Sequence, residues 1–403
     1  MESNVGLNKE KLIKIIFNPG NTTYLTHNFH PYPGKFIPQI PRYIIERYSK
    51  EEEWIMDPFC GSGTALVEAK LLRRNAIGID INPLAVLMSK VKTTKIPENE
   101  LAVIPYWLKK VETRITAFYL KYNKNHSLLK YVNLENIAEE CSFKYKIPYF
   151  PNRDHWFQKH VLHELAIIRD SILQEKFSER LRNFILLAFS SIIVPVSNQE
   201  SETRYAAVKK HIPPKKAFSM FKEKLNDMIE RIRKFNKVAA DTLIKVYHAD
   251  SRNLYFIKDN SVDLIVTSPP YPNTYDYYLY HKLRMFWLNL NWEVAKIKEI
   301  GSRLRHSSFK EDIDTYIRDM IKCFKHFHRI LKPGKYFAVI VGDSIIRGKV
   351  IKADKVISEI AQHTSFEVVD KLSYSLDYVS KSFNPAFRSK NKEEHIILLR
   401  NIK

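Results

Sequence analysis

The stretch DPFCGSGTALVEA, residues 57–69, decides the fold, because two glycines stand between a predicted buried strand and a predicted helix. WIMDPF (54–59) predicts the strand and GTALVEAKLLRR (63–74) predicts the helix. At such a junction the chain turns tightly and lets a ligand approach its backbone. A second predicted strand, NAIGIDI (75–81), contains Asp80 near its end, where a carboxylate can bind ribose hydroxyls. The order strand, glycine turn, helix, strand predicts a nucleotide-binding α/β fold.

The acid before the glycines, Asp57, narrows the class of ligand. A dinucleotide site holds pyrophosphate at the helix N-terminus, where a carboxylate would repel it. S-adenosylmethionine has an ammonium, a sulfonium and no phosphate, so it suits the acid better. The spacing F-x-G-x-G, from Phe59 to Gly63, also departs from the G-x-G-x-x-G of dinucleotide sites. The alternative is a plain strand-to-helix turn without a ligand.

Strands alternating with helices return in the last part of the chain, which favours a parallel sheet. The predicted strands there are IKVYHAD (244–250), VDLIVTS (262–268), YFAVIVGD (336–343) and HIILLR (395–400). Residues 92–240 differ, because their apolar residues recur with helical periodicity. We therefore divide the chain into an α/β half (1–91), a helical insertion (92–240) and a second α/β half (241–403).

A second unusual junction, TSPPY (267–271), ends the predicted strand VDLIV (262–266). Proline cannot donate to a sheet ladder, so the two prolines stop the strand in a stiff corner. Asp276, shortly after it, is a candidate polar ligand. Four tyrosines around this acid begin a helical stretch, and packing is expected of them more than substrate contact: Tyr275, Tyr277, Tyr278 and Tyr280.

DPFCGSGT, GIDINPLA (78–85) and TSPPY together resemble the amino-group DNA methyltransferases, which methylate cytosine N4 or adenine N6. HPYPGKFIPQIP (30–41) is similar to the family's cofactor segment upstream of the glycine turn. HADSRNL (248–254) and LKPGKYFAVIVGD (331–343) are similar to later segments of the sheet. The resemblance implies a Rossmann-like class I methyltransferase fold, a doubly wound, mostly parallel sheet with a helical insertion. The insertion precedes HADSRNL rather than TSPPY, which departs from the commonest arrangements of the family.

The resemblance also implies S-adenosyl-L-methionine as the cofactor and gives roles to the three parts. Residues 1–91 are the cofactor-binding half, 92–240 recognise the target, and 241–403 are the catalytic half. The expected cofactor-binding residues are His30, Pro31, Lys35, Asp57, Phe59, Gly61, Gly63, Thr64, Asp80, Asn82 and Asp250. The first three of these are expected to cover the methionine end of the cofactor; the alternative is a chain-entry loop on the sheet. The expected catalytic residues are Ser268, Pro269, Pro270 and Tyr271.

The chemistry of an exocyclic amine explains this corner. The amine lone pair is delocalised into the base, so acceptors must hold its hydrogens and draw the lone pair outward. Ser268 Oγ and the Pro269 carbonyl can accept them, and Tyr271 can stack on an extruded base, which is worth roughly 1–3 kcal/mol. The corner must be stiff, because misplacing reactants by about 1 Å can cost ~100-fold in rate.

Serine at the first position of S-P-P-Y favours cytosine N4, because adenine-N6 enzymes usually carry Asp or Asn there. The alternatives are an adenine-N6 DNA methyltransferase, an RNA base methyltransferase and a non-catalytic nucleic-acid-binding subunit. A carbon-5 cytosine methyltransferase is disfavoured, because it needs a nucleophilic cysteine, usually after proline, and the chain has no Pro-Cys pair. A serine hydrolase is disfavoured because no G-x-S-x-G occurs.

The net charge of +21 favours a polyanionic partner, and we expect double-stranded DNA. Residues 91–240 hold 27 basic and 16 acidic residues, so about half of the excess lies in the insertion. Within it, the composition of 197–216 predicts a polar, basic loop. The expected DNA contacts are Arg204, Lys209, Lys210, Lys215 and Lys216. The alternative is a basic surface that is merely solvated.

The three cysteines, Cys60, Cys141 and Cys323, form no C-x-x-C pair, so we expect neither a metal site nor a disulfide. Asp343 is expected to end a strand rather than to perform chemistry. No apolar run approaches the ~20 residues of a membrane helix, and the N-terminus lacks a signal-peptide core. We therefore expect a cytoplasmic protein, with a cognate restriction endonuclease as a second partner. The sequence leaves the oligomeric state open.

Overall fold

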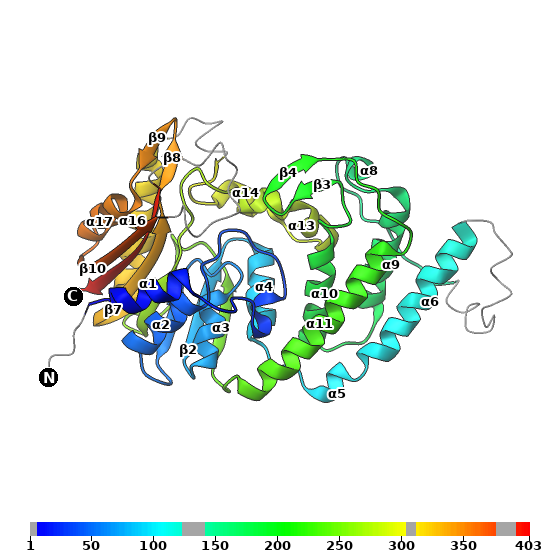
Figure 1. Ribbon diagram of the computed structural model, residues 1–403, viewed down its shortest axis with the longest axis horizontal. Helices are drawn as coiled ribbons and strands as arrows, with labels where there is room; N and C mark the ends of the chain where they lie inside the picture. The colour runs from blue at the N-terminus through cyan, green and yellow to red at the C-terminus, as the bar shows by residue number, and fades with distance from the viewer. Residues whose placement is uncertain (1–5, 123–141, 304–311, 376–391) are drawn as a thin grey trace.

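The protein is built on one seven-stranded sheet, seen in a computed structural model that describes residues 6–122, 142–303, 312–375 and 392–403 (Figure 1). The strand order is β10-β11-β7-β6-β1-β2-β5. The strands are β1 (Trp54–Asp57), β2 (Asn75–Asp80), β5 (Ile244–His248), β6 (Val262–Thr267), β7 (Leu331–Gly342), β10 (Phe366–Ser375) and β11 (Glu393–Asn401). The strands from β7 to β5 are parallel, and β11 is antiparallel to both of its neighbours. The predicted mostly parallel sheet is confirmed.

Helices cover both faces of this sheet, because its strands alternate apolar side chains between two cores. Ile55 and Leu264 face a core with α1 (Lys9–Phe17), α2 (Gln39–Tyr48) and α3 (Thr64–Leu71). Met56 and Ile265 face the opposite core with α16 (Ile313–Ile330) and α17 (Ala353–Gln362). The sheet is therefore doubly wound, as predicted.

The insertion is a helical body beside the sheet, between α4 (Pro83–Thr93) and β5 (Figure 1). Its helices are α5 (Glu98–Leu101), α6 (Ile104–Tyr122), α8 (Arg153–Trp156), α9 (Lys159–Gln174), α10 (Glu179–Ile192) and α11 (Lys216–Val238). One apolar cluster runs from Met88 of α4 through Phe189 and Phe221 of the insertion to Trp287 of the catalytic half. The insertion therefore shares its core with both α/β halves.

The prediction of a plain loop over 197–216 is wrong in part, because the segment contains a short hairpin. The hairpin pairs β3 (Gln199–Ser201) with β4 (Arg204–Ala207). Glu202 at its turn accepts two hydrogen bonds of 2.7 Å from Arg284, which is fully buried in α13 (Lys282–Leu288). This long-range ion pair holds the hairpin against the catalytic half.

Several further elements were not predicted from the sequence. Strand β10 forms an edge of the sheet, and β8 (Ser344–Ile346) pairs with β9 (Lys349–Ile351) in a second hairpin. The short helices η1 (Leu25–Asn28) and α14 (Trp292–Lys298) and the single-turn α8 were not predicted either, whereas α12 (Tyr277–Tyr280) begins the helical stretch that the sequence predicts there. Cys60 and Cys323 are buried free thiols, whereas Cys141 lies outside the described residues.

Candidate active site

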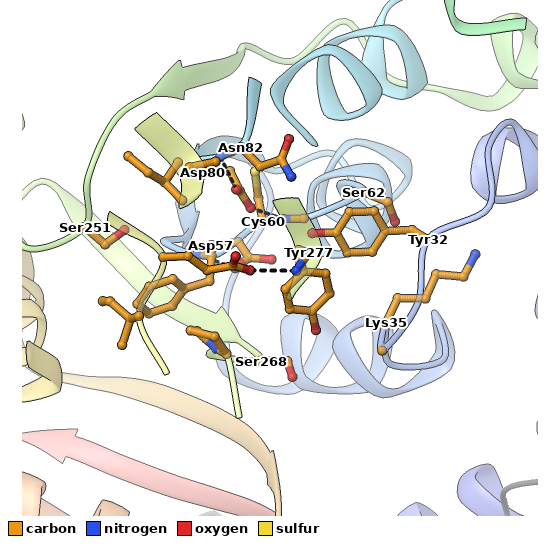
Figure 2. A pocket seen from close by; sticks show the side chains of 18 of the residues that line it. Tyr32, Lys35, Asp57, Cys60, Ser62, Asp80, Asn82, Ser251, Ser268 and Tyr277 are labelled. Atoms are coloured by element: carbon orange, nitrogen blue, oxygen red, sulfur yellow. Dashed lines mark hydrogen bonds between the residues drawn. The ribbon is translucent and has the colours of Figure 1, made fainter. Parts of the chain in front are cut away.

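A cavity with about 860 Å³ of empty space, the solvent at its open mouth included, lies where β1, β2, β5 and β6 end, at their carboxyl edges (Figure 2). This is the edge where open α/β sheets bind ligands. Ten of the predicted site residues line the cavity: Lys35, Asp57, Phe59, Gly61, Thr64, Asp80, Asn82, Asp250, Ser268 and Pro270. The fold thus brings the glycine turn and the Ser-Pro-Pro-Tyr corner, about 200 residues apart in the chain, to one cavity.

The glycine turn after β1 has a backbone shape that requires glycine. Gly63 precedes α3 with φ of +79°, in the left-handed region. A Cβ there would lie 2.9 Å from the Cα of Ser89, a backbone atom that cannot yield. Ser89 Oγ in turn donates to the Gly61 carbonyl at 3.0 Å. The turn is therefore packed tightly on α4, and Gly63 shapes it without lining the cavity itself.

Asp80 closes the turn from the end of β2. Its carboxylate accepts hydrogen bonds from the backbone N–H groups of Gly61 and Asn82, both at 2.8 Å. Asn82 then caps α4 by accepting from Leu84 N at 3.0 Å. Burial raises the pKa of Asp80 to about 6 despite these hydrogen bonds. The acid faces the cavity, where a ligand can reach its remaining lone pairs (Figure 2).

Asp57 links the glycine turn to the catalytic corner. Its Oδ1 accepts hydrogen bonds from Thr267 Oγ1 at 2.6 Å and from Phe59 N at 3.2 Å. Thr267 is the residue before Ser268, so the two motifs are joined by one hydrogen bond. Burial raises the pKa of Asp57 to about 7, and the nearby charge of Asp80 contributes in the same direction. Two buried acids on one cavity favour a cationic ligand.

Sequence reasoning missed a third acid and two tyrosines that line the same cavity. Glu299 follows α14 and accepts a hydrogen bond from Tyr277 N at 2.9 Å. Burial raises its pKa well above the usual value. The rings of Tyr32 and Tyr277 stack with centroids 5.4 Å apart (Figure 2). Tyr277 thus lines the cavity, although the sequence favoured packing over substrate contact for it. Its position a few residues after the Ser-Pro-Pro-Tyr corner was the only sequence feature that pointed to the cavity.

The Ser-Pro-Pro-Tyr corner presents Ser268 and Pro270 to the cavity. Pro269 is buried, and the half-buried ring of Tyr271 lies against Gly342 at the end of β7. Ser268 Oγ donates to Tyr271 Oη at 3.2 Å, and Tyr271 Oη donates to Glu394 Oε1 at 3.1 Å. Pro269 and Tyr271 are therefore next to the cavity without being part of its lining.

The other predicted cofactor residues differ in their surroundings. Lys35 lines the cavity and donates to the His27 carbonyl at 3.2 Å. His30 is buried behind it, with Nδ1 2.7 Å from the Pro31 carbonyl and Nε2 3.0 Å from Ser190 Oγ. His30 and Pro31 do not line the cavity. Asp250 does, but Arg252 holds its carboxylate with two hydrogen bonds of 3.0 and 2.8 Å. The charge of Asp250 is therefore already balanced.

The five predicted DNA-contacting residues lie in or near the β3–β4 hairpin. Lys209 and Lys216 are exposed, as is Lys215, which precedes α11. Arg204 pairs with Glu200 at 2.8 Å, and the half-buried Lys210 donates to the Gln199 carbonyl. The hairpin therefore uses Lys210 internally, while three lysines remain exposed.

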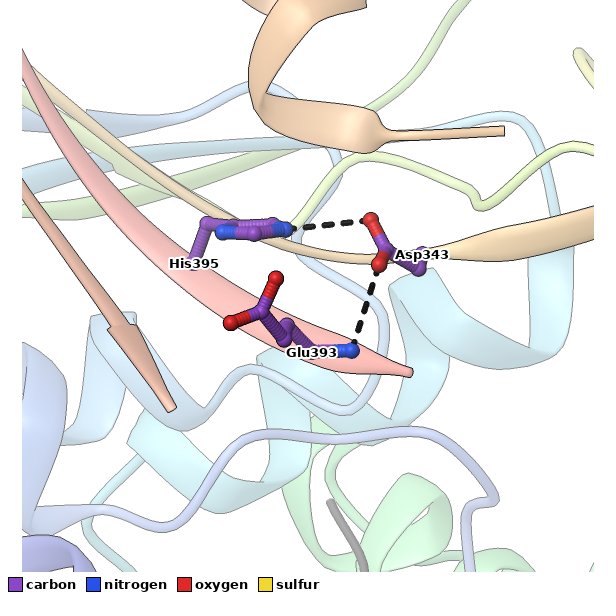
Figure 3. A group of neighbouring side chains, drawn as sticks. All are labelled: Asp343, Glu393 and His395. Atoms are coloured by element: carbon purple, nitrogen blue, oxygen red, sulfur yellow. Dashed lines mark hydrogen bonds and ion pairs between the residues drawn. The ribbon is translucent and has the colours of Figure 1, made fainter. Parts of the chain in front are cut away.

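A candidate cation site lies behind the corner, where Asp343, Glu393 and His395 converge (Figure 3). Asp343 follows the last residue of β7, as predicted, and accepts hydrogen bonds from His395 Nε2 at 3.1 Å and Glu393 N at 3.2 Å. The Lys352 ammonium donates to Asp343 at 2.8 Å and to Glu393 at 3.0 Å. One internal cation thus already pairs with both acids, and we interpret the group as structural.

Comparison with known proteins shows to which family the chain belongs. The profile of the N6/N4 DNA methylase family matches residues 6–90 and 262–401. The chain belongs to this family. It is 26% identical over 390 residues to the Type II methyltransferase M.MvaI of Kocuria varians, covering 84% of this chain and 82% of that protein.

Two further proteins are similar. Identity to the Type II methyltransferase M.MjaII of Methanocaldococcus jannaschii is 25% over 386 residues, covering 79% of this chain and 72% of that protein. A solved S-adenosylmethionine-dependent methyltransferase from Methanosarcina mazei matches 93% of this chain and 99% of its own, with 11% identity and a TM-score of 0.33. The family model leaves out 91–261, which includes the helical insertion.

Family membership confirms three predictions. The fold is the Rossmann-like class I methyltransferase fold, the cofactor is S-adenosyl-L-methionine, and the reaction is methylation of an amino group in DNA. The cavity fits this cofactor, because buried acids suit its cationic ammonium and sulfonium, and the glycine turn leaves room for it. Within the described ranges, no helix is both long and apolar enough to cross a membrane.

Cofactor affinity is expected to fall as the pH falls through 7 and then 6. A cationic ligand favours the ionised forms of Asp57 and Asp80. The cofactor therefore binds with its full affinity only above their pKa values of about 7 and about 6. Below its pKa, each acid is protonated in the free protein and must release that proton when the cofactor binds. This lowers the cofactor affinity by up to about tenfold for each pH unit and each acid. Calorimetry in two buffers of different ionisation enthalpy measures the affinity and the protons released.

Two controls accompany this titration. Asp57→Asn should remove the upper step, and S-adenosylhomocysteine, which lacks the sulfonium charge, should show a weaker pH dependence. An affinity that stays constant between about pH 8 and about pH 6, without proton release, contradicts the assignment of these acids.

Proposed function

We propose that the protein transfers the methyl group of S-adenosylmethionine to N4 of cytosine within a specific sequence of double-stranded DNA. One observation carries the choice of base: the first residue of the corner is Ser268, whose side chain lines the cavity. The resemblance favours cytosine N4 for serine at this position, whereas adenine-N6 enzymes usually carry Asp or Asn. The DNA methylase family, together with the Type II methyltransferase relatives, supports DNA as the acceptor.

In this proposal the cofactor lies between the turn at 57–63 and Asp80. Asp80 accepts the ribose hydroxyls, as its position at the end of β2 suits. Asp57 and Glu299 supply negative charge toward the cationic methionine end, and the stacked Tyr32 and Tyr277 exclude water beside it. When bound, S-adenosylmethionine supplies a methyl group activated by its positively charged sulfur.

The corner then activates the amine. Ser268 Oγ and the Pro269 carbonyl accept the amine hydrogens, which turns the lone pair out of the ring plane. Pro269 and Pro270 hold this carbonyl in one direction, because their φ angles are restricted. The half-buried Tyr271 offers a stacking surface to the extruded base, which offsets part of the few kcal/mol needed to flip it.

Nucleoside analysis of methylated DNA tests the choice of base. Genomic DNA from a host without its own modification is incubated with the protein and labelled cofactor, digested to nucleosides and analysed by mass spectrometry. N4-methylcytosine is expected. N6-methyladenine would overturn the choice of base, label in RNA alone would overturn the choice of polymer, and no label in either would favour a non-catalytic subunit.

We also propose that the basic hairpin region grips the DNA backbone. Phosphate contacts release counterions, so removing one of them should flatten the log–log salt dependence of binding by about 0.9. Replacing Lys209, Lys215 and Lys216 by Gln should therefore reduce the log–log salt slope by up to three times this amount, and should weaken binding to all DNA sequences alike. Titration of labelled duplexes at several salt concentrations measures both.

A matched control for this triple variant is Lys245→Gln, because Lys245 lies on β5 over the Trp54 ring, outside the insertion. It should leave the slope nearly unchanged. Equal affinity and an equal slope in the triple variant would contradict the proposal and move the DNA surface elsewhere.

A cognate restriction endonuclease stays a prediction, supported by the Type II relatives. Sequencing of methylated DNA would reveal the recognition sequence. An endonuclease specific for that sequence should then fail to cut DNA modified by this protein. Cleavage at the normal rate would contradict the pairing.

A further inference from the structure

A chain of hydrogen bonds leads from the cavity wall into the sheet. Ser268 Oγ donates to Tyr271 Oη at 3.2 Å, which donates to Glu394 Oε1 at 3.1 Å. The other oxygen of Glu394 accepts from the hydroxyl of Tyr374 on β10. A side chain that lines the cavity is thus connected, through one tyrosine, to a buried carboxylate on β11.

The direction of this chain follows from the chemistry of its members. An ionised carboxylate can only accept, so Tyr271 must use its single proton on Glu394. Ser268 must then use its own proton on Tyr271. The Ser268 oxygen therefore turns lone pairs, and not a proton, toward the cavity. An acceptor is what an amine needs there.

The neighbours of Glu394 in the sheet leave room for its contact with Tyr271. Glu394 lies opposite Gly342 of β7 and Tyr374 of β10 in the sheet. A Cβ at Gly342 would come within 3.0 Å of the Tyr271 ring, so glycine makes room for the tyrosine. Strand pleating sends the neighbours Glu393 and His395 to the opposite side, where they meet Asp343 (Figure 3).

Among the residues that the structure describes, few charged or titratable groups surround Glu394. Tyr271 and Tyr374 donate to it, Tyr275 lies near enough to feel its charge, and His395 is next to it on the strand. Burial raises the pKa of Glu394 above its usual value, while the two tyrosine hydrogen bonds oppose that rise. A buried carboxylate whose two hydrogen-bond donors are tyrosine hydroxyls can take up a proton.

We propose that Glu394 is a positioning residue that orients the Ser268 hydroxyl through Tyr271 and receives the proton released by the methylated amine. The inference rests on the proposed function, because it requires an amine at Ser268. Methyl transfer leaves the sulfur neutral with the former C–S electron pair, and leaves the nitrogen positively charged with one proton too many. That proton passes to Ser268 Oγ, the Ser268 proton passes to Tyr271 Oη, and the Tyr271 proton passes to Glu394. The amine ends neutral, and Glu394 ends as a carboxylic acid that is deprotonated before the next turnover.

Glu394→Gln tests this role. The amide keeps the shape of the side chain but cannot accept a proton and has only one acceptor oxygen for two tyrosine hydroxyls. Single-turnover methylation at neutral pH is expected to fall on the order of 100-fold, the lower end of what a positioned proton acceptor contributes. With cofactor and duplex both saturating at every pH, so that weaker binding at Asp57 and Asp80 does not limit the rate, the decline of the wild-type rate at acidic pH, where Glu394 becomes protonated, should be absent in the variant. The matched control is Glu393→Gln, one residue away on the opposite side of β11, which should retain the wild-type rate.

Two readouts do not depend on turnover. Cofactor affinity by calorimetry should be equal in wild type and Glu394→Gln. The infrared difference between the two proteins, titrated without cofactor or DNA, should show one carboxyl band whose midpoint lies above the ordinary glutamate value of about 4.3. An unchanged rate and pH profile in a folded Glu394→Gln overturns the proposal, as does a loss that Glu393→Gln shares.

If thermal melting shows that Glu394→Gln is misfolded, Tyr271→Phe breaks the same chain and keeps the ring. It should lose the rate to the same extent with cofactor affinity retained; a normal rate in Tyr271→Phe overturns the relay. The proposed function is tested separately from the role of Glu394. It is wrong if the wild-type protein does not produce N4-methylcytosine, whatever the variants do.

Discussion

Ser268→Ala is expected to lower the single-turnover rate of methylation roughly 100- to 1,000-fold, with cofactor affinity unchanged. Removing one preorganised hydrogen-bonding partner of a transition state costs about this much in other enzymes. Ser268 Oγ is the acceptor that lines the cavity, and the alanine variant also disconnects Tyr271 and Glu394 from the substrate. Rapid-quench methylation of a saturating duplex measures the rate, and calorimetry measures the affinity.

Ser344→Ala is the matched control for this prediction. Ser344 is a buried serine at the start of β8, two residues after β7 ends, and it does not line the cavity. Its variant should methylate at nearly the wild-type rate. If Ser268→Ala also methylates at that rate, the corner has only a structural role, and the proposed mechanism is wrong.

Asp80→Ala is expected to weaken cofactor binding by about 1.5–3 kcal/mol, or roughly 10- to 150-fold. The variant loses a charged acceptor for the ribose and also the hydrogen bonds that hold Gly61 N and Asn82 N. The turn therefore loses its brace as well as its ligand contact. Calorimetry with S-adenosylmethionine measures the affinity, and circular dichroism verifies the fold.

Asp263→Ala supplies the control, because Asp263 is another buried aspartate of the same sheet. It lies near the amino end of β6, away from the cavity, where it accepts from Trp54 N at 3.1 Å and pairs with Lys332. Its loss should lower the melting temperature without weakening cofactor binding by more than about twofold. Equal cofactor affinity in Asp80→Ala and wild type would remove Asp80 from the cofactor site.

Much of the fold could be predicted because its signals are short-range. The run from β1 through the glycine turn to β2 combines apolar strands, a glycine with positive φ at Gly63 and a helical period within about 30 residues. Strands β5, β6, β7 and β11 also lie where apolar runs predicted them. Strand β10 was missed because its exposed and half-buried residues show little apolar pattern, and β11 supplies its pairing.

The candidate site was predictable only in its motifs. Asp57, Asp80 and Ser268 stand in recognisable stretches at strand ends, and all three line the cavity. Glu299 carried no local signal, because a glutamate after a polar helix usually faces solvent. Tertiary packing buries it beside Tyr277. The β3–β4 hairpin was equally hidden, since Arg284 holds it from about 80 residues further along the chain.

The sequence by itself determined which segments form the sheet's main strands, the turn that requires glycine and the corner that ends β6, because each depends on residues close together in the chain. Tertiary structure alone decided which side chains meet across those elements. In the sequence, Glu393, Glu394 and His395 are three adjacent polar residues with no evident difference in role. Only the pairing of β11 between β7 and β10 turns Glu394 toward Tyr271 and its neighbours toward Asp343, because strand pleating sends alternate residues to opposite faces.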